Sequence, residues 1–267
     1  MNRLDIASKW VLVTGASSGL GQEVARYLVN KEQANVLLVA RRAERLNTLK
    51  TELESSSNSR VDVLACDLTN EDEYDRVLAA ALAYPDLAAA VLNAGVTFFG
   101  PHDSIPLDSQ RRIVSLNVDA KAALATSLVK HWQSQQQPGG LLLVSSLAGH
   151  FPLPYQALYS GTKGFITNFG IALAREVSNS PVSVTVFSPG GIATEMIENS
   201  GLNRLPGGNF FNNPPTRCAR YAVDALLKRR MVASSSWFDY LALVIGRAIP
   251  YRISTWGLER IYRQGLP

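Results

Sequence analysis

The chain has 267 residues, of which 46% are hydrophobic and 18% charged, and its net charge is +4. This is an ordinary composition for a globular protein, with room for one large α/β domain or two small ones. Two cysteines exclude a disulfide framework, so we expect reduced thiols in a cytoplasmic protein. No apolar run approaches the roughly 18–20 residues of a membrane span. The first nine residues lack the apolar core of a secretory signal.

The positive charge is concentrated in the last part of the chain. From Arg217 onward there are nine Lys/Arg and three Asp/Glu, so the remainder carries −2. These basic residues lie among tryptophan, leucine and isoleucine. That mixture favours a lipid surface or an acidic substrate, and we expect no nucleic-acid partner.

Short apolar runs alternate with helical patterns along the chain. Strands are expected at Trp10–Thr14, Asn35–Ala40, Val61–Ala65, Leu87–Asn93, Leu141–Val144 and Val182–Phe187. Helices are expected at Gly19–Lys31, Glu44–Glu54, Glu71–Ala83, Leu107–Trp132, Leu158–Val177 and Pro215–Arg230. Apolar strands separated by helices indicate an α/β fold with a doubly wound parallel sheet of about seven strands, flanked by helices.

The connecting segments do not divide the chain into domains. Gln133–Gly140 is a Gln/Pro/Gly loop, and Gly201–Pro215 is the longest irregular piece. A long loop inside a compact domain is usually functional or disordered. We therefore expect one domain over residues 1–267, with residues 195–267 as a substrate lid and C-terminal extension.

A glycine-rich turn follows the first strand, with the sequence Thr14-Gly15-Ala16-Ser17-Ser18-Gly19-Leu20-Gly21. Glycines let a backbone turn sharply toward a pyrophosphate, whose charge meets the N-terminus of the next helix. The same letters fit the G-x-S-x-G elbow of hydrolases. We reject that interpretation because no histidine follows His150. A purely structural turn remains the alternative to dinucleotide binding.

Arg41 and Arg42 follow the second strand, where NAD enzymes place an acid to hold the ribose 2′-hydroxyl. A guanidinium offers several fixed donors to a 2′-phosphate, which favours NADP(H) over NAD(H). Arg41 is the leading candidate, with Arg42 behind it. The alternative is an ordinary basic helix start.

Tyr159 and Lys163 are four residues apart at the start of a predicted helix, so their side chains share one face. A phenol has a pKa of about 10, and a nearby ammonium lowers it. Ser146 ends the fifth strand, thirteen residues before Tyr159. A phenol with a lowered pKa exchanges protons more easily at neutral pH, so Tyr159 and Lys163 indicate acid/base chemistry.

Taken in order, the motifs between Val11 and Thr194 resemble those of classical short-chain dehydrogenases/reductases. The glycine turn has the TGxxxGxG spacing, and Tyr159 and Lys163 fit YxxxK. Leu92-Asn93-Ala94-Gly95 is similar to the family's NNAG, with leucine in place of its first asparagine, and Ser188-Pro189-Gly190-Gly191-Ile192-Ala193-Thr194 resembles its PG motif. The resemblance implies a Rossmann-like oxidoreductase that interconverts a carbonyl and an alcohol, as a homodimer or homotetramer.

The resemblance also implies roles for four catalytic residues. Tyr159 would be the acid/base, and Lys163 would lower its pKa and hold the nicotinamide ribose. Ser146 would orient the carbonyl oxygen, with Ser145 as the alternative. Asn117 would support a proton-relay water.

A second set would bind NADP(H). Asp67 would contact the adenine, unless it belongs to a helix N-terminal cap. Ile192 and Thr194 would contact the carboxamide. The full set expected at the cofactor is Gly15, Ser17, Ser18, Gly19, Leu20, Gly21, Arg41, Arg42, Asp67, Leu68, Asn93, Ala94, Gly95, Tyr159, Lys163, Pro189, Gly190, Ile192 and Thr194.

The tail beyond the PG motif predicts an apolar or lipid-like substrate. Trp237–Ile245 is nearly all apolar, and arginines interleaved with aromatic residues follow it. Such a mixture suits peripheral contact with a membrane surface. A subunit contact and a last strand closing the sheet stay open as alternatives. A catalytically inactive NADP(H)-binding sensor is the alternative to the enzyme.

Overall fold

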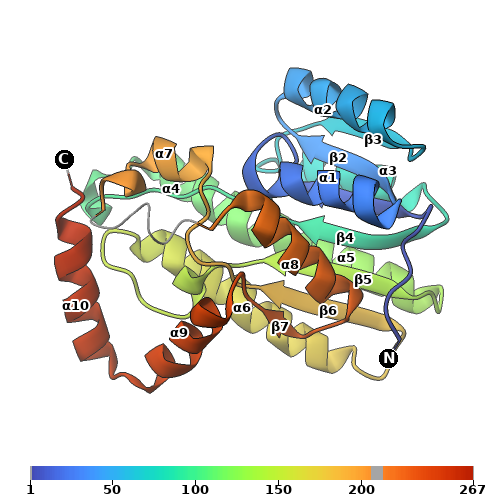
Figure 1. The fold of residues 1–267 in the computed structure, drawn as a ribbon. Helices are drawn as coiled ribbons and strands as arrows, with labels where there is room; N and C mark the ends of the chain where they lie inside the picture. Colours follow the sequence, from blue (N-terminus) through green and yellow to red (C-terminus); the bar gives the residue numbers. More distant parts are fainter. Residues whose placement is uncertain (1, 206–212, 267) are drawn as a thin grey trace.

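In the computed structural model, which describes residues 2–205 and 213–266, seven parallel strands form one sheet in the order β3-β2-β1-β4-β5-β6-β7 (Figure 1). The strands are β1 (Trp10–Thr14), β2 (Asn35–Ala40), β3 (Val61–Ala65), β4 (Leu87–Leu92), β5 (Gly139–Val144), β6 (Val182–Phe187) and β7 (Val232–Ala233). The order reverses direction between β1 and β4, which is the topology of a doubly wound sheet. The predicted fold class is confirmed.

Helices cover both faces of the sheet. They are α1 (Gly19–Glu32), α2 (Ala43–Ser56), α3 (Glu71–Leu82), α4 (Leu107–Val114), α5 (Ala120–Ser134), α6 (Ala157–Glu176), α7 (Glu195–Ser200), α8 (Pro215–Leu227), α9 (Trp237–Ala248) and α10 (Tyr251–Arg263). On β1, Val11 and Val13 pack toward α1, α2 and α8, whereas Trp10 and Leu12 pack toward α3, α5 and α6. Because alternate residues of a strand face opposite sides, a strand covered on both sides is apolar throughout.

Several element boundaries differ from the sequence prediction. The helix expected over Leu107–Trp132 is interrupted by a π-helical turn at Ser115–Asp119, between α4 and α5. Strand β5 begins at Gly139, within the predicted loop Gln133–Gly140. A Cβ on Gly139 would lie 2.3 Å from the ring of Trp132, so the tryptophan excludes any side chain there.

The apolar run Trp237–Ile245 falls within helix α9, so the open alternative of a closing strand is wrong. The edge position beside β6 is taken by β7 instead. Ser236 starts the helix, because its Oγ accepts a hydrogen bond of 3.0 Å from the backbone N–H of Asp239. Within the described residues, no helix combines the length and apolar character needed to cross a membrane.

The carboxyl ends of the strands all point to one side of the molecule, toward α7, α9 and α10 (Figure 1). The loops that leave these strands, and the helices that follow them, carry the residues singled out from the sequence. In the predicted long loop Gly201–Pro215, residues 206–212 lie outside the described part of the chain.

Candidate active site

The glycine turn between β1 and α1 brings bare backbone to the edge of the sheet. Gly15 and Gly19 have φ of +70° and +55°, which side-chain-bearing residues rarely adopt. A Cβ on Gly15 would lie 2.8 Å from Cα of Ala94, and one on Gly21 would lie 2.3 Å from the carbonyl oxygen of Gly15. The turn is therefore compact, and only glycine fits at these positions.

The N-terminus of α1 is open to an anion. Ser18 precedes the helix without making a side-chain capping bond, and the first turn carries no acidic residue. Unpaired N–H groups and the helix dipole at such an end attract negative charge. These features fit the pyrophosphate of a dinucleotide.

Arg42 lies over the glycine turn. Its Nη2 donates to Oγ of Ser18 at 2.8 Å and to Oγ of Ser17 at 3.0 Å. Its Nη1 donates to Oε2 of Glu195, at the start of α7, at 2.9 Å. Glu195 also pairs with Arg45. Hydrogen bonds from Arg42 and then Arg45 lower the pKa of the Glu195 carboxyl.

Arg41 points elsewhere. Its Nη1 lies 3.7 Å from Oδ2 of Asp67, which Nη2 of Arg112 approaches to 3.5 Å. The other oxygen of Asp67 accepts bonds from the N–H and hydroxyl of Thr69 and forms a local turn. Asp67 thus stands between two guanidiniums, and the buried Leu68 follows it. Of the two arginines singled out from the sequence, it is Arg42 that contacts the glycine turn.

The segment after β4 ties the turn to the reaction side. Nδ2 of Asn93 donates to the carbonyl oxygens of Thr14 and Gly15 at 3.1 and 3.3 Å. A Cβ on Gly95 would lie 3.0 Å from Oδ1 of Asn117 and 3.6 Å from Nζ of Lys163. Glycine at this position therefore lets the two predicted catalytic residues approach the loop.

Asn117 sits in the π-helical turn and is fully buried. Its Oδ1 accepts from the N–H of Val96 at 3.0 Å, and its Nδ2 donates to the carbonyl of Val96 at 2.9 Å. The same amide donates to Oγ1 of Thr162 on α6 at 3.1 Å. Asn117 thereby joins the β4 loop to the helix that carries Tyr159 and Lys163. Single π-turns inside helices are frequent at functional sites.

Ser146, Tyr159 and Lys163 come together at the ends of β5 and α6. Nζ of Lys163 lies 5.7 Å from the ring centroid of Tyr159, and Ser146 lies near the phenol. Burial raises the pKa of Tyr159, and Ser146 opposes that rise. Burial lowers the pKa of Lys163 to about 8. The three side chains form a compact group whose chemistry suits proton transfer.

Ser145, the alternative to Ser146, faces the opposite way. Its Oγ donates to the carbonyl of Lys163 at 3.0 Å and lies 2.7 Å from Oγ1 of Thr167. Both contacts are buried and both fix α6 against the end of β5. Ser145 therefore holds the helix, whereas Ser146 faces the phenol.

The PG motif, residues 188–194, contacts the loop after β5, helix α9 and the glycine turn. The carbonyl of Pro189 accepts from the N–H of Leu147 at 2.9 Å. A Cβ on Gly190 would lie 2.7 Å from Oδ1 of Asp239. A side-chain carbon of Thr194 lies 2.8 Å from where a Cβ on Gly19 would stand. Thr194 thus comes directly over the glycine turn.

A family model described as short chain dehydrogenase matches residues 9–204, which include the turn, Asn117, Ser146, Tyr159 and Lys163. The chain belongs to the short-chain dehydrogenase family. It is an oxidoreductase of the carbonyl/alcohol type with a nicotinamide dinucleotide cofactor.

Relatives of this dehydrogenase cover different shares of its length. It is 28% identical to 17-beta-hydroxysteroid dehydrogenase type 3 of Mus musculus over 251 residues, 92% of this chain and 77% of that protein. It is 34% identical to very-long-chain 3-oxoacyl-CoA reductase of Pyricularia oryzae over 180 residues, 66% of this chain and 54% of that protein. The chain thus spans only about half the length of the second relative.

A solved short-chain dehydrogenase from Sphingobium yanoikuyae in complex with NADPH is 25% identical and superposes with a TM-score of 0.81. That alignment covers 90% of this chain and 93% of the solved one.

Two site residues of this dehydrogenase escaped the sequence analysis. Tyr262 on α10 packs edge-on to Phe99 with ring centroids 6.0 Å apart, and burial and Tyr159 raise its pKa to about 12. Lys121 on α5 is buried one helical turn after Asn117. The sequence signal for Lys121 was a lysine within an apolar helix face. The sequence of the tail contains no such signal for Tyr262.

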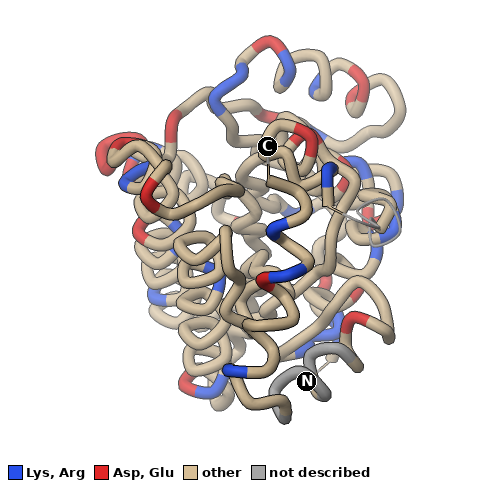
Figure 2. Tube along the Cα trace, turned by 90° about the vertical axis from the view of Figure 1, so that its left-hand side faces the viewer, with Lys and Arg blue, Asp and Glu red and all other residues tan. Residues whose placement is uncertain are grey.

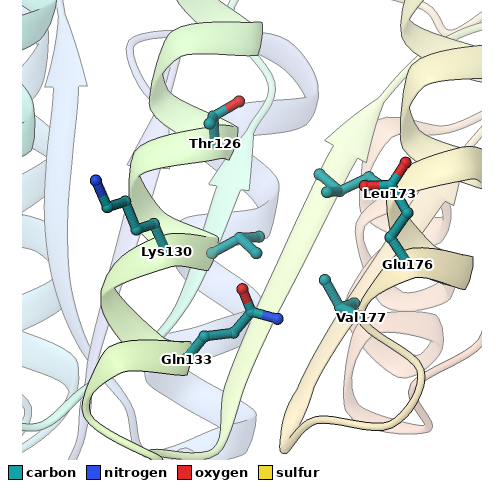
Figure 3. Close-up of a pocket in the computed structure, with 7 residues that line it drawn as sticks. Thr126, Lys130, Gln133, Leu173, Glu176 and Val177 are labelled. Carbon is teal, nitrogen blue, oxygen red and sulfur yellow. The ribbon is translucent and has the colours of Figure 1, made fainter.

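Two hollows flank α6 on different sides. One, of about 450 Å³, lies between the loop after β5 and α10; its lining includes His150, Phe151, Leu153, Gly161 and Tyr251. The other lies between α5 and α6, remote from Tyr159, and Figure 3 shows Lys130 and Glu176 on its opposite walls. Only the first adjoins the segment that connects Ser146 to Tyr159.

Proposed function

We propose that this dehydrogenase uses NADP(H) to interconvert a carbonyl and an alcohol on an apolar, lipid-like substrate. The observation that carries the proposal is that Tyr159 is flanked by Ser146 and by Lys163, whose Nζ lies 5.7 Å from the ring centroid. A catalytically inactive sensor has no physical need for this arrangement.

In the reductive direction, Tyr159 donates its phenolic proton to the carbonyl oxygen as that oxygen becomes negative. Ser146 donates a hydrogen bond to the same oxygen and orients it. The Lys163 ammonium stabilises the phenolate that is left behind, because an adjacent cation favours the charged form of a phenol. The cofactor supplies or accepts the hydride when it is bound.

The preference for NADP(H) rests on Arg42. A 2′-phosphate beside the glycine turn would meet the Arg42 guanidinium and the hydroxyls of Ser17 and Ser18, which already contact that guanidinium. Arg41 adds positive charge close by, although Asp67 offsets part of it. The solved relative from Sphingobium yanoikuyae binds NADPH, which is consistent with this preference.

The apolar substrate is supported by the walls of the site. Phe99, Leu153 and Leu202 are buried close to the site, and Tyr262 packs against the first of these. The two relatives described above act, by name, on a steroid and on a very-long-chain acyl thioester. Both names denote substrates with a large apolar part, a steroid ring system in one and a very long acyl chain in the other.

We also propose that the segment after the PG motif covers the substrate. Helix α10 is held to the loop after β5, since Tyr155 hydrogen-bonds both Glu259 and Arg263 at 3.3 Å. A Cβ on Gly265 would lie 2.8 Å from the side chain of Leu205, so the end of the chain also rests on the segment after α7. A substrate that enters between the loop after β5 and the segment after α7 therefore has to pass α10.

The outer side of α9 and α10 suits a lipid surface. Trp237, Phe238, Tyr251 and Trp256 each expose more than half of their surface. Figure 2, which looks onto this side, shows basic positions along the C-terminal helix with one acidic position among them. Aromatic rings at headgroup depth beside guanidiniums stabilise peripheral binding to anionic lipid.

The test is a screen of NADPH oxidation against simple ketones, steroid ketones and 3-oxoacyl thioesters of increasing chain length. We expect turnover that rises with the apolar size of the substrate and that falls roughly 10²–10⁴-fold in Tyr159→Phe, which keeps the ring but loses the proton. Tyr221→Phe, on the remote helix α8, serves as the matched control. NADPH binding by calorimetry without turnover on any substrate would favour the sensor.

A further inference from the structure

Lys121 is a buried lysine next to the catalytic group, and the mechanism above makes no use of it. It projects from α5 one helical turn beyond Asn117, and only 2% of its surface is exposed. Its Nζ donates to the carbonyl oxygen of Val144, the last residue of β5, at 3.2 Å. Nζ of Lys163 donates to the same oxygen at 3.0 Å. Two amines therefore meet at one backbone acceptor.

No negative charge balances this pair. Within residues 2–205 and 213–266, no carboxylate oxygen lies within 4 Å of either Nζ, and the charged side chains that are buried there are these two lysines. Burial of a cation is unfavourable without a partner, and two adjacent buried cations repel each other as well. The arrangement therefore favours a state in which one of the two amines is neutral, so that the pair carries one positive charge instead of two.

We propose that Lys121 is a positioning residue whose neutral amine accepts a hydrogen bond from the Lys163 ammonium and so keeps Lys163 charged beside Tyr159. This inference rests on the proposed function, in which Lys163 acts as a cation. Lys121 touches neither the phenol nor Ser146 and acts only through Lys163.

The perturbed pKa values agree in direction with this geometry. Burial, and then Lys163, lower the pKa of Lys121 well below its ordinary value. Burial also lowers the pKa of Lys163 to about 8, but the hydrogen bond to Lys121 acts in the opposite direction. Removing the Lys121 amine should therefore lower the pKa of Lys163 further.

The other groups around the pair do not replace this interaction. From α6, Tyr159 is neutral when its pKa is raised by burial. From α10, Tyr262 faces Tyr159 with a pKa of about 12. From β5 and the β4 loop, the neighbours are the carbonyl of Val144 and the backbone of Gly95. The lone pair of Lys121 is thus the nitrogen acceptor available to the Lys163 ammonium.

The first test is the pH dependence of kcat/KM for ketone reduction in Lys121→Met, which keeps the side-chain volume. Activity requires charged Lys163, so it falls as pH rises through the pKa of that group. We expect the alkaline fall to move to lower pH by about one unit, as loss of a hydrogen bond to a charged group requires. Lys130→Met, an exposed position on the same helix, should leave the profile unchanged. An alkaline limb that stays in place or moves to higher pH overturns the proposal.

The second test needs no substrate. The Nζ resonances of the ¹⁵N-lysine-labelled wild-type protein and of Lys121→Met are followed by NMR from pH 6 to 11. We expect one neutral amine at pH 7 in the wild type and its absence in the variant. Two ammonium signals from the buried pair at pH 7 would overturn the shared proton, whatever the turnover. A neutral Lys121 in a protein that reduces no carbonyl would instead refute the proposed function and leave the shared proton supported.

Discussion

Arg42 and Glu195 are 153 residues apart in the chain and form an ion pair of 2.9 Å beside the glycine turn. The ion pair links the end of β2 to the start of α7 and so holds the first residues after the PG motif close to α1. Glu195 is also paired with Arg45 on α2, so two ion pairs hold the start of α7 at this end of the site. The Glu195 carboxylate is thus paired with the Arg42 guanidinium, which is the group that a 2′-phosphate of NADP(H) would bind.

Glu195→Gln should therefore bind NADPH more tightly. Because the amide is uncharged, Arg42 no longer has to exchange a carboxylate for the phosphate. A charge-assisted bond contributes about 1.5–3 kcal/mol. Binding of NADPH to the variant no longer has to break such a bond between Arg42 and Glu195, so we expect KM for NADPH to fall several-fold. KM for NADH should change little. Glu198→Gln, an exposed acid on the same helix, is the control, and an equal effect on both cofactors would contradict the competition.

The two arginines after β2 should differ in importance. Arg42→Ala should reduce kcat/KM for NADPH roughly ten- to a hundredfold and leave NADH almost unaffected. Arg41→Ala should have a smaller effect, because Asp67 already pairs with that guanidinium. Initial rates with both cofactors measure this. Equal use of NADPH and NADH by the wild-type protein would refute the cofactor assignment.

The adjacent serines should separate stability from turnover. Ser146→Ala removes the hydroxyl that lies near Tyr159 and should lower kcat by roughly 10²-fold or more. It also removes the bond of 3.1 Å that this hydroxyl accepts from the N–H of Ala148, so Tm should fall, but less than in Ser145→Ala. Ser145→Ala removes two buried contacts to α6 and should cost about 1–3 kcal/mol of unfolding free energy with kcat reduced only a few-fold. Thermal unfolding and single-substrate kinetics on both variants provide the measurement. The reverse pattern would exchange the roles of the two residues.

Lys121 should lower stability at neutral pH. The folded-state pKa of Lys121 is depressed below its ordinary value of 10.5, so the unfolded chain binds more protons between the two pKa values. In that window the stability of the wild type rises with pH. Lys121→Met should be more stable than wild type at pH 7, and the difference should shrink as pH approaches 10.5. Urea unfolding at several pH values tests this; a variant that is less stable at pH 7 would contradict it.

The aromatic surface of α9 and α10 should control lipid binding. We expect the protein to co-sediment with anionic vesicles, and a variant with serine at Trp237, Phe238, Tyr251 and Trp256 to remain in solution. These side chains are exposed, so the fold measured by circular dichroism should persist. Phe165→Ser, at an exposed position on α6, is the control. If the wild-type protein does not bind such vesicles, the membrane contact is wrong.

Most of the sheet and most of the candidate site residues could be predicted from local pattern. Uniformly apolar runs such as Asn35–Ala40 require cover on both faces, and helices between them require parallel pairing. Glycine at positions 15 and 19 reflects a backbone conformation that few other residues tolerate, so its spacing carries information without the fold. The same holds for Tyr159 and Lys163, whose four-residue spacing fixes a common helix face.

What only the tertiary structure decided depends on contacts between distant segments. The sequence places Arg41 and Arg42 side by side, and the approach of Ser17 and Glu195 selects Arg42 for the glycine turn. Thr167 on α6 likewise determines that Ser145 faces the helix, and so leaves Ser146 to the phenol. Local propensity cannot predict which neighbour a side chain meets, because that depends on packing across the sheet. Lys121 shows this most clearly: its amine meets Val144 and Lys163 only once α5, β5 and α6 have packed together.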